Sequence, residues 1–420
     1  MRLTSGSNVA AASPEQQTRR QAVIATNKIK QLLEGIYSQE PVIGLTHNFY
    51  RYPARFSPVF SRAAIEAFTD ENEIVFDPFM GGGTTLVEAT AMGRRAVGTD
   101  LNSLAVFLAQ VKTTVLSTKQ LAKLRSWAEK TSRQLNVWAP ARRAKEWVEL
   151  GYQRNINTRD TWRIRKLTEI ALHSAESFPT PDERRFARCI VLKTAQWALD
   201  CRAEVPHVSD FRQEFRKSAD EMVGSLAEYG RAVRQSIKRQ RCPEQGPICL
   251  HRSAVGIERE PSLRLCNPIR LVLTSPPYPG VHVLYHRWQV QGRRETPAAF
   301  WIANTLDGNG ASFYTFGDRK AHQLESYFNQ AVAAFKSIAK LCNQDTWVVQ
   351  MVAFSDPTWQ LPRYISTMED AGFREVMLPG ITDTHDGRVW RSVPNRKWYA
   401  SQRGSTSSSN EVVLFHRLRQ

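Results

Sequence analysis

A serine, two prolines and a tyrosine directly after an apolar run form the most informative group of side chains in this chain. The run 269–273 predicts a buried strand, and Ser275-Pro276-Pro277-Tyr278 follows it. Two consecutive prolines cannot continue strand pairing, so the chain must turn there and leave carbonyl groups pointing away from the sheet. Carbonyl and hydroxyl acceptors beside the flat face of a tyrosine would suit the exocyclic amino group of a nucleobase. A proline-rich surface loop is the alternative that this motif alone leaves open.

A second motif predicts a nucleoside-binding unit upstream. The strand predicted at 73–76 runs into the sequence DPFMGGGTT, which begins at Asp77. Its three glycines allow a sharp turn and a close approach of the backbone to a ligand, and Thr84 or Thr85 is suited to cap the helix that follows. The next strand, 96–98, leads to Asp100, at the spacing where an acidic side chain binds ribose hydroxyls in nucleoside-binding folds. The motif is neither a P-loop nor a G-x-G-x-x-G fingerprint, and a βαβ unit without a ligand is the alternative.

Together the two motifs resemble those of the amino-group DNA methyltransferases that use S-adenosylmethionine. DPFMGGGTT looks like the cofactor loop of that family and SPPY like its catalytic loop, while HNFYRYPARF, residues 47–56, resembles the segment that closes over the methionine end of the cofactor. The resemblance covers roughly residues 45–110 and 245–418. It implies an α/β fold of the Rossmann-like class I methyltransferase type, with a mostly parallel seven-stranded sheet, a terminal antiparallel strand and, in this chain, a helical insert.

The resemblance assigns roles to residues in both loops. Ser275 Oγ and the Pro276 carbonyl would accept hydrogen bonds from the target amine, Pro277 belongs to the same rigid turn, and Tyr278 would stack on the base. In the cofactor loop, Asp77 would accept from the methionine amino group, and Asp100 would accept from the ribose hydroxyls. The residues expected to bind S-adenosylmethionine are Tyr52, Phe56, Asp77, Phe79, Gly81, Gly83, Thr84, Asp100 and Asn102, with Asn102 and a further candidate, Ser253, equally open to a structural role.

The residue before Pro-Pro-Tyr indicates the target base. In the family that the chain resembles, serine is usual for cytosine N4, and aspartate or asparagine is more usual for adenine N6. The expected function is therefore site-specific cytosine-N4 methylation of DNA in a restriction or defence system, with a cognate restriction endonuclease as the implied partner. An adenine-N6 enzyme, an RNA base methyltransferase and a non-catalytic nucleic-acid-binding protein stay open. Methylation at C5 is disfavoured because it needs a cysteine that usually follows a proline, and Cys242-Pro243 has the reverse order.

Positioning is expected to carry most of the catalysis. The lone pair of an exocyclic amine is delocalised into the base, and hydrogen bonds to fixed acceptors favour the geometry needed for attack. The amine is out of reach within a stacked duplex, so double-stranded DNA would be bound with the target base flipped out. No general base is evident in the sequence, and solvent is expected to take the proton.

The composition favours a polyanionic partner. The 420 residues carry a formal net charge of +17 and a pI of about 9.8, which is the electrostatic footprint of nucleic-acid binding. No uncharged apolar run is long enough for a membrane span, and the first residues lack the apolar core of a signal peptide. Six cysteines without a C-x-x-C pair favour neither a disulfide framework nor a zinc site, so no metal and a reduced, cytoplasmic setting are expected.

Three segments are expected along the chain. Residues 1–113 would hold an N-terminal segment, with a helix at 22–36, and the cofactor-binding half; 246–420 would hold the catalytic half. The insert 114–245 is a candidate DNA-recognition module, because its 26 lysines and arginines against 16 acids contribute more than half of the net charge. Its apolar spacing predicts helices at 121–137, 161–174, 182–199 and 211–237. The last segment predicts strands at 248–251, 269–273, 346–354 and 373–378, helices at 321–342 and 362–371, and a hairpin of 396–400 with 411–416.

The stretch after the catalytic loop interleaves aromatic and basic side chains, a composition that suits contact with nucleic acid. The residues expected to bind nucleic acid are His282, Tyr285, Arg287, Trp288, Arg293 and Arg294, with His286 and Trp301 in the same stretch. A solvated loop with tryptophans in the core is the alternative. A further basic cluster of Arg388, Arg391, Arg396 and Lys397 is open to either a phosphate contact or a solvated face.

Overall fold

The apolar runs predicted as strands pair into one sheet. The computed structural model describes residues 26–52, 56–140, 145–240, 246–263, 268–280, 287–292, 294–308, 311–317, 322–378, 380, 386–393 and 409–419. Within these ranges the sheet has eight strands: β1 (Ile74–Asp77), β2 (Arg95–Asp100), β3 (Ile248–His251), β4 (Ile269–Thr274), β7 (Cys342–Ala353), β8 (Phe373–Glu375), β9 (Val389–Val393) and β10 (Ser409–Leu418).

The strand order β3-β2-β1-β4-β7-β10-β8, with β9 paired to β10, reverses between β1 and β4. Strands β3, β2, β1, β4 and β7 are parallel, and β10 runs antiparallel to β7, β8 and β9. At such a reversal the connections on either side leave toward opposite faces, and a crevice opens beyond the carboxyl ends of the two strands. The predicted Rossmann-like, mostly parallel fold with an antiparallel strand near its end is confirmed.

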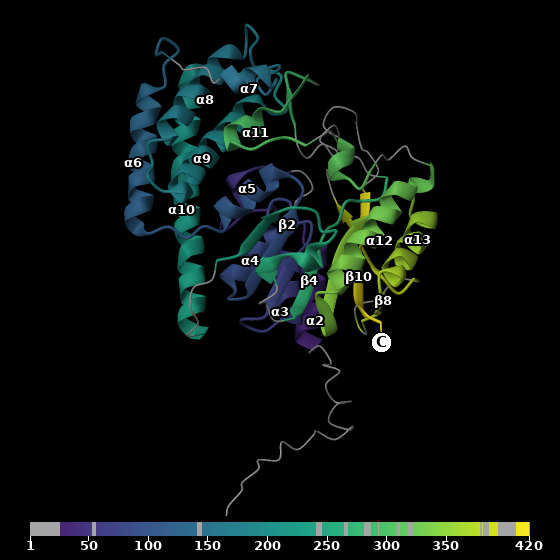
Figure 1. Cartoon of the computed structure of the whole chain (residues 1–420). Helices are drawn as coiled ribbons and strands as arrows, with labels where there is room; N and C mark the ends of the chain where they lie inside the picture. Colours follow the sequence, from purple (N-terminus) through teal and green to yellow (C-terminus); the bar gives the residue numbers. More distant parts are fainter. Residues whose placement is uncertain are drawn as a thin grey trace, which may run out of the picture.

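Helices cover both faces of the sheet, because its central strands are apolar on both sides (Figure 1). One face packs against α2 (Thr26–Tyr37), α3 (Pro58–Phe68), α4 (Thr84–Ala91) and α5 (Ser103–Lys112), through strand residues such as Val75 and Leu271. The opposite face packs against α12 (Glu325–Ala339) and α13 (Pro357–Asp370), through residues such as Phe76 and Val272. The alternation of Val75 and Phe76 between the two cores is the period of two that a strand imposes.

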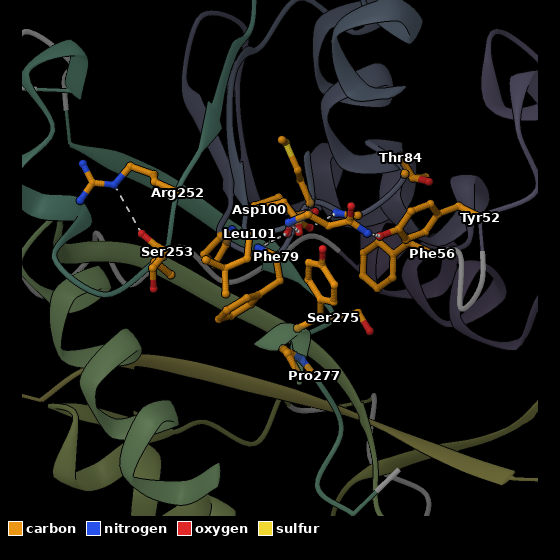
Figure 2. A pocket seen from close by; sticks show the side chains of 18 of the residues that line it. Tyr52, Phe56, Phe79, Thr84, Asp100, Leu101, Arg252, Ser253, Ser275 and Pro277 are labelled. Atoms are coloured by element: carbon orange, nitrogen blue, oxygen red, sulfur yellow. Dashed lines mark hydrogen bonds between the residues drawn. The ribbon is translucent and has the colours of Figure 1, made fainter. Parts of the chain in front are cut away.

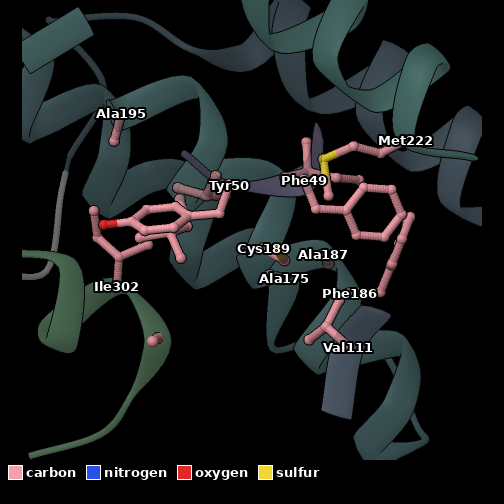
Figure 3. Packing of buried hydrophobic residues seen from close by; sticks show 14 of the residues in the cluster. Phe49, Tyr50, Val111, Ala175, Phe186, Ala187, Cys189, Ala195, Met222 and Ile302 are labelled. Carbon is pink, nitrogen blue, oxygen red and sulfur yellow. The ribbon is translucent and has the colours of Figure 1, made fainter. Parts of the chain in front are cut away.

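The four helices predicted in the insert are present, and they form a second body beside the sheet together with a short helix that was not predicted (Figure 1). The four are α6 (Thr118–Gln134), α8 (Trp162–Ala175), α9 (Pro181–Leu199) and α10 (Val208–Gln240), and the additional helix is α7 (Lys145–Glu149). Their core also contains Phe49 and Tyr50 from the N-terminal segment, which lie among the helices together with Phe186 and Met222 (Figure 3).

A short hairpin and a helix from the catalytic half join the same body. Strands β5 (Trp288–Val290) and β6 (Arg294–Thr296) pair antiparallel, and α11 (Ala298–Ala303) follows them; β5 and α11 both contact α9. The helical body therefore draws on chain from before, within and after the segment 114–245. The three segment boundaries remain predictions.

Several elements differ in extent from the prediction. The helix expected at 362–371 begins at Pro357, because the Asp356 side chain caps it by accepting from the amide of Thr358 at 3.1 Å, and Pro362 lies inside the helix. Strand β10 pairs with β9, and the strand expected at 396–400 lies outside the described residues. Strand β7 begins before 346, and β8 ends before 378.

The described residues also contain short 3-10 helices. They are η1 (His47–Phe49), η2 (Ile257–Arg259), η3 (Pro261–Leu263), η4 (Ala311–Tyr314) and η5 (His322–Leu324). No helix in the described ranges is long and apolar enough to cross a membrane.

A buried polar cluster fastens the N-terminal segment to the helix that follows the glycine loop. His47 Nε2 lies 2.8 Å from Glu88 Oε1 on α4, and Arg62 Nε on α3 donates to Glu88 Oε2 at 2.9 Å. Burial lowers the pKa of His47, so the imidazole is neutral at pH 7 and donates from Nε2. Burial alone would raise the pKa of Glu88, but the hydrogen bonds from His47 and Arg62 lower it below its usual range. The Glu88 carboxylate on α4 therefore binds both His47 of the N-terminal segment and Arg62 of α3.

We expect Glu88→Ala to lower the free energy of unfolding by about 3 kcal/mol, because the buried imidazole loses its acceptor and the ion pair with Arg62 is broken. Urea denaturation of the purified chain measures the change. The matched control is Glu71→Ala, at an exposed position before β1, which should change stability by less than about 0.5 kcal/mol. Equal stabilities for the two variants would contradict the role of Glu88.

Candidate active site

The loop between β1 and α4 turns sharply because two of its glycines adopt backbone angles that other residues rarely take. Gly81 has φ 46° and Gly83 has φ 76°. A Cβ on Gly83 would lie 3.0 Å from the Cα of Ala109 in α5, so a larger residue would force the backbone apart. The loop is held from two sides, since the Gly81 amide donates to Asp100 Oδ2 at 2.9 Å and Lys112 Nζ donates to the Gly82 carbonyl at 2.7 Å. These contacts fix the loop at the ends of β1 and β2.

The cap of α4 differs from the prediction. Gly83 is the N-cap, whereas Thr84 and Thr85 are the first two residues of the helix. The Thr85 hydroxyl donates instead to the carbonyl of Leu273 in β4, at 3.4 Å. Because glycine has no side chain that could accept from the first-turn amides, the positive end of the helix dipole is not covered by a cap side chain.

A pocket lies where the carboxyl ends of β1, β2 and β4 meet (Figure 2). It is lined by side chains that come from widely separated parts of the sequence, as the reversal of strand order requires. The lining residues are Tyr52, Phe56, Asp77, Pro78, Phe79, Met80, Gly81, Gly82, Thr84, Asp100, Leu101, Asn102, Arg252, Ser253, Ala254, Ser275, Pro277, Tyr314 and Phe316. Most of the predicted cofactor-binding residues therefore share one pocket with Ser275 and Pro277. Gly83, Pro276 and Tyr278 are not among the lining residues.

Two carboxyl groups, the buried Asp77 and the partly exposed Asp100, lie at the glycine loop. Asp100 accepts from the amides of Gly81 and Asn102, at 2.9 and 2.8 Å. Asp77 accepts from the Thr274 hydroxyl at 2.7 Å and from the Phe79 amide at 3.2 Å. Burial raises the pKa of each aspartate to about 6, although these hydrogen bonds act in the opposite direction. Both groups are mostly ionised at pH 7, and an ionised carboxylate has further lone pairs for ligand hydroxyl or amino groups.

Asn102 and Ser253 have observed structural roles as well as a place in the pocket. The Asn102 side chain caps α5 by accepting from the Leu104 amide at 3.0 Å, and it donates to the Tyr52 hydroxyl at 3.1 Å. Ser253 Oγ accepts from the Val255 amide at 3.1 Å. A contact of either side chain with a cofactor stays a prediction.

In the catalytic loop, Ser275 lies at the pocket and Tyr278 lies behind it. The Ser275 hydroxyl donates to the Tyr278 hydroxyl at 2.9 Å, and the Tyr278 hydroxyl donates to Glu411 Oε1 at 2.8 Å. The carbonyl of Pro277 accepts from the Tyr327 hydroxyl at 2.6 Å. Tyr278 is only 7% exposed, so its ring is not presented to the pocket in this arrangement. Its stacking on a base stays a prediction, as does the acceptor role of the Pro276 carbonyl.

Sequence reasoning missed part of the pocket wall. Arg252 and Ala254 follow directly on the predicted strand 248–251, so the rule that ligands bind at carboxyl ends would have included them. Tyr314 and Phe316 come from 311–317, which carries no periodic pattern. Phe316 meets the ring of Phe79 edge to face, with the centroids 5.3 Å apart. This aromatic wall depends on a tertiary contact that no local motif signals.

The aromatic and basic stretch after the catalytic loop is divided between core and surface. Trp288 is 2% exposed and donates from Nε1 to the Tyr50 hydroxyl at 2.8 Å. Trp301 is also buried. The prediction that Trp288 meets nucleic acid is therefore corrected: the helical body encloses its ring. Arg294 is exposed, and Arg287 pairs with Asp307 and Glu295 at 3.4 and 3.5 Å. Four further residues, His282, Tyr285, His286 and Arg293, lie outside the described residues.

The basic cluster near the end of the chain forms ion pairs rather than a solvated face or a phosphate site. Arg388 donates to both carboxylate oxygens of Glu375, at 2.8 and 2.7 Å. Arg391 binds Glu411 Oε2 through two nitrogens, at 2.9 and 2.8 Å. Arg391 and Glu411 lie on the paired strands β9 and β10, whereas Arg388 directly precedes β9 and Glu375 is the last residue of β8. Arg396 and Lys397 lie outside the described residues.

Comparison with known proteins supports the resemblance drawn from the motifs. Residues 10–111 match the family model described as DNA methylase. The type II methyltransferase M.MvaI of Kocuria varians is 35% identical over 96 residues, which are 22% of this chain and 21% of that protein. The type II methyltransferase M.MjaII of Methanocaldococcus jannaschii is 31% identical over 78 residues, which are 19% of this chain and 15% of that protein. The resemblance to amino-group DNA methyltransferases is confirmed for this part of the chain.

A solved structure, the rRNA methyltransferase aviRa from Streptomyces viridochromogenes, aligns with 93% of this chain and 92% of its own length. The TM-score is 0.31 and the sequence identity is 11%. A score of this size supports no statement about substrate.

We expect S-adenosylmethionine to bind more tightly as the pH rises from 5 to 7, because Asp77 and Asp100, whose pKa values are raised to about 6, accept more strongly once ionised. Isothermal titration calorimetry at several pH values measures this. Asp100→Asn should weaken binding about tenfold at pH 7 and flatten part of the pH dependence. Glu71→Ala, distant in the loop before β1, is the control. An unchanged affinity and pH profile in the Asp100 variant would remove this residue from the binding site.

Proposed function

We propose that this chain transfers a methyl group from S-adenosylmethionine to the exocyclic N4 amine of cytosine in DNA. One observation carries the proposal: a single pocket is lined by the glycine loop, by the carboxyl groups of Asp77 and Asp100, and by Ser275. A nucleoside-binding loop and an acceptor for an amine are the two parts that this transfer needs. The family match and the two type II methyltransferases support the same reaction class.

The donor set of the pocket fits S-adenosylmethionine. Asp100 would accept from the ribose hydroxyls and Asp77 from the methionine amino group, since each is a carboxylate that is mostly ionised at pH 7. The space that a Cβ on Gly83 would need is already occupied by α5, so the loop backbone packs directly against α5 at this position. Phe79 and Phe316 supply apolar ring surface in the same wall. When bound, S-adenosylmethionine supplies a methyl group that the positive sulfur has already activated.

The residues of the chain act mainly by positioning. Ser275 Oγ would accept a hydrogen bond from the target amine and hold its nitrogen in line with the methyl group. The amine must leave the base stack to reach a pocket at the end of β4, so the target base would be flipped out of the duplex. Serine before Pro-Pro-Tyr favours cytosine N4 over adenine N6.

Exposed arginines on the helical body form a candidate DNA surface next to the hairpin β5–β6. Arg154, Arg159 and Arg163 lie on the chain around α8 and are exposed, as is Arg294 on β6. The hairpin is joined to this chain by Asn155 Nδ2, which donates to the Glu295 carbonyl at 2.8 Å. Two contacts connect this candidate DNA surface to the pocket. Arg287, which precedes β5, pairs with Asp307, and Asp307 accepts from the hydroxyl of the pocket residue Tyr314 at 2.8 Å. We infer that DNA phosphates contact these arginines.

A restriction or defence system is the setting that the comparisons favour. Two of the similar proteins are described as type II methyltransferases. The proposed partner is a cognate restriction endonuclease that cuts the same site when it is unmethylated.

We expect Arg159→Ala and Arg294→Ala each to weaken DNA binding to a similar degree on all sequences, because arginine contacts to phosphate carry no base information. Each should also reduce the slope of log affinity against log salt by about 1. Fluorescence anisotropy of a labelled duplex at several salt concentrations measures both effects. Lys336→Ala, exposed on α12, is the control. An unchanged slope in both arginine variants would move the DNA surface elsewhere.

Incubation of the purified chain with unmethylated genomic DNA and isotopically labelled S-adenosylmethionine should give labelled N4-methylcytosine. The DNA is digested to nucleosides, and the labelled nucleoside is identified by mass spectrometry. The expected product follows from the serine at position 275. Labelled N6-methyladenine would keep the reaction class and reject the base assignment. Label in structured RNA but not in DNA would reject DNA as the substrate.

A further inference from the structure

The proposed role of Ser275 requires its hydroxyl to accept a hydrogen bond, yet a serine hydroxyl can either donate or accept. A series of hydrogen bonds in the structure determines whether the Ser275 hydroxyl donates or accepts. Ser275 Oγ donates to the Tyr278 hydroxyl at 2.9 Å, and the Tyr278 hydroxyl donates to Glu411 Oε1 at 2.8 Å. An ionised carboxylate can only accept. Both hydroxyl hydrogens therefore point toward Glu411, and the lone pairs of Ser275 are left for a group in the pocket.

We propose that Glu411 is a positioning residue that orients the hydroxyls of Tyr278 and Ser275, and that it receives the proton released when the target amine is methylated. This inference rests on the proposed function and deepens it. It gives the buried hydroxyl of Tyr278 a role separate from the stacking that the motif predicts for its ring. It also names a destination for the proton, for which the sequence alone indicates only solvent.

The proton balance follows the same chain. The lone pair of the amine forms the nitrogen–carbon bond while the carbon–sulfur electron pair returns to sulfur, which leaves as a neutral thioether. The methylated nitrogen then holds one excess proton. That proton passes to Ser275 Oγ, the hydroxyl proton of Ser275 passes to the Tyr278 oxygen, and the hydroxyl proton of Tyr278 passes to Glu411. Each oxygen gains one proton and loses one, and Glu411 releases its proton to solvent before the next turnover.

The contacts of Glu411 fix its side chain at the end of the proton relay. Its side chain is 6% exposed, and Arg391 on β9 binds Oε2 through two nitrogens, at 2.9 and 2.8 Å, so that Oε1 is the oxygen facing Tyr278. On β7 the residue opposite Glu411 is Ala353. From α2, the carbonyl of Ile36 accepts from Arg391 at 3.3 Å. Tyr364 of α13 lies near Tyr278, and burial raises its pKa. Arg391 and Tyr364 are charged or titratable groups that lie against the relay.

Three substitutions in the full chain separate a proton relay from a purely structural link. Tyr278→Phe keeps the ring and removes the hydroxyl; Glu411→Gln keeps an acceptor and removes the base; Arg391→Gln keeps the carboxylate and removes its cation. The measurement is the single-turnover rate of methyl transfer to unmethylated genomic DNA between pH 5 and 9. Calorimetry of S-adenosylmethionine binding and thermal unfolding are recorded for each variant, to exclude loss of the cofactor site or of the fold.

For the relay, Tyr278→Phe and Glu411→Gln should each slow transfer about 100-fold, while the affinity for S-adenosylmethionine stays within about twofold. The pH profile of transfer in Glu411→Gln should differ from that of the wild type. Arg391→Gln keeps the carboxylate and should transfer at least about tenfold faster than Glu411→Gln. A structural link alone would instead make Arg391→Gln as slow as Glu411→Gln, because both variants lose the same ion pair.

A folded Tyr278→Phe variant that transfers methyl groups at the wild-type rate would overturn the relay, as would a wild-type pH profile in Glu411→Gln. Both results presuppose a wild-type chain that labels DNA, so the proposed function would stand. A wild-type chain that binds S-adenosylmethionine but labels neither DNA nor RNA would overturn the proposed function itself, and the relay with it.

Discussion

The hydrogen bond from Thr274 to Asp77, 2.7 Å long and buried at both ends, joins the last residues of β4 and β1. These are the two strands between which the order of the sheet reverses. Parallel pairing brings their carboxyl ends to one edge, and this contact fixes how the glycine loop after Asp77 lies relative to the Pro-Pro turn after Thr274. A second contact, from Thr85 to the Leu273 carbonyl, ties the helix of the first loop to the strand of the second. The pocket exists because these two loops cannot move independently.

The sheet and both loops could be predicted because their residues restrict the backbone locally. Glycine at positive φ and consecutive prolines allow few conformations, and apolar runs identified β1, β2, β3 and β4. The motif resemblance then gave most of the pocket residues. The position of the α4 cap was predicted wrongly, because threonine is a common cap and the close approach of α5 to Gly83 is invisible in the sequence.

Other features depend on contacts between distant residues, which a local pattern does not contain. Glu411 is 133 residues from Tyr278 and 20 from Arg391, and only the pairing of β10 with β9 and β7 brings the three together. Trp288 shows a different limit. Its neighbours are polar and basic, as on a nucleic-acid surface, but the hydroxyl of Tyr50 and the apolar side chains of the helical body enclose it. The sequence shows which side chains are present, whereas tertiary packing decides whether each one is buried or exposed.

The shared core of the helical body limits how this chain could have been assembled or could be re-engineered. Phe49 and Tyr50 from the start of the chain, the helices between β2 and β3, and the segment from Trp288 to Ala303 are packed in one apolar cluster. Excision of the insert would strip the buried faces of α5 and α11 of their cover. The helical body and the sheet are therefore not interchangeable cassettes, and a chimera that exchanges the helical body would have to carry all three chain segments across together.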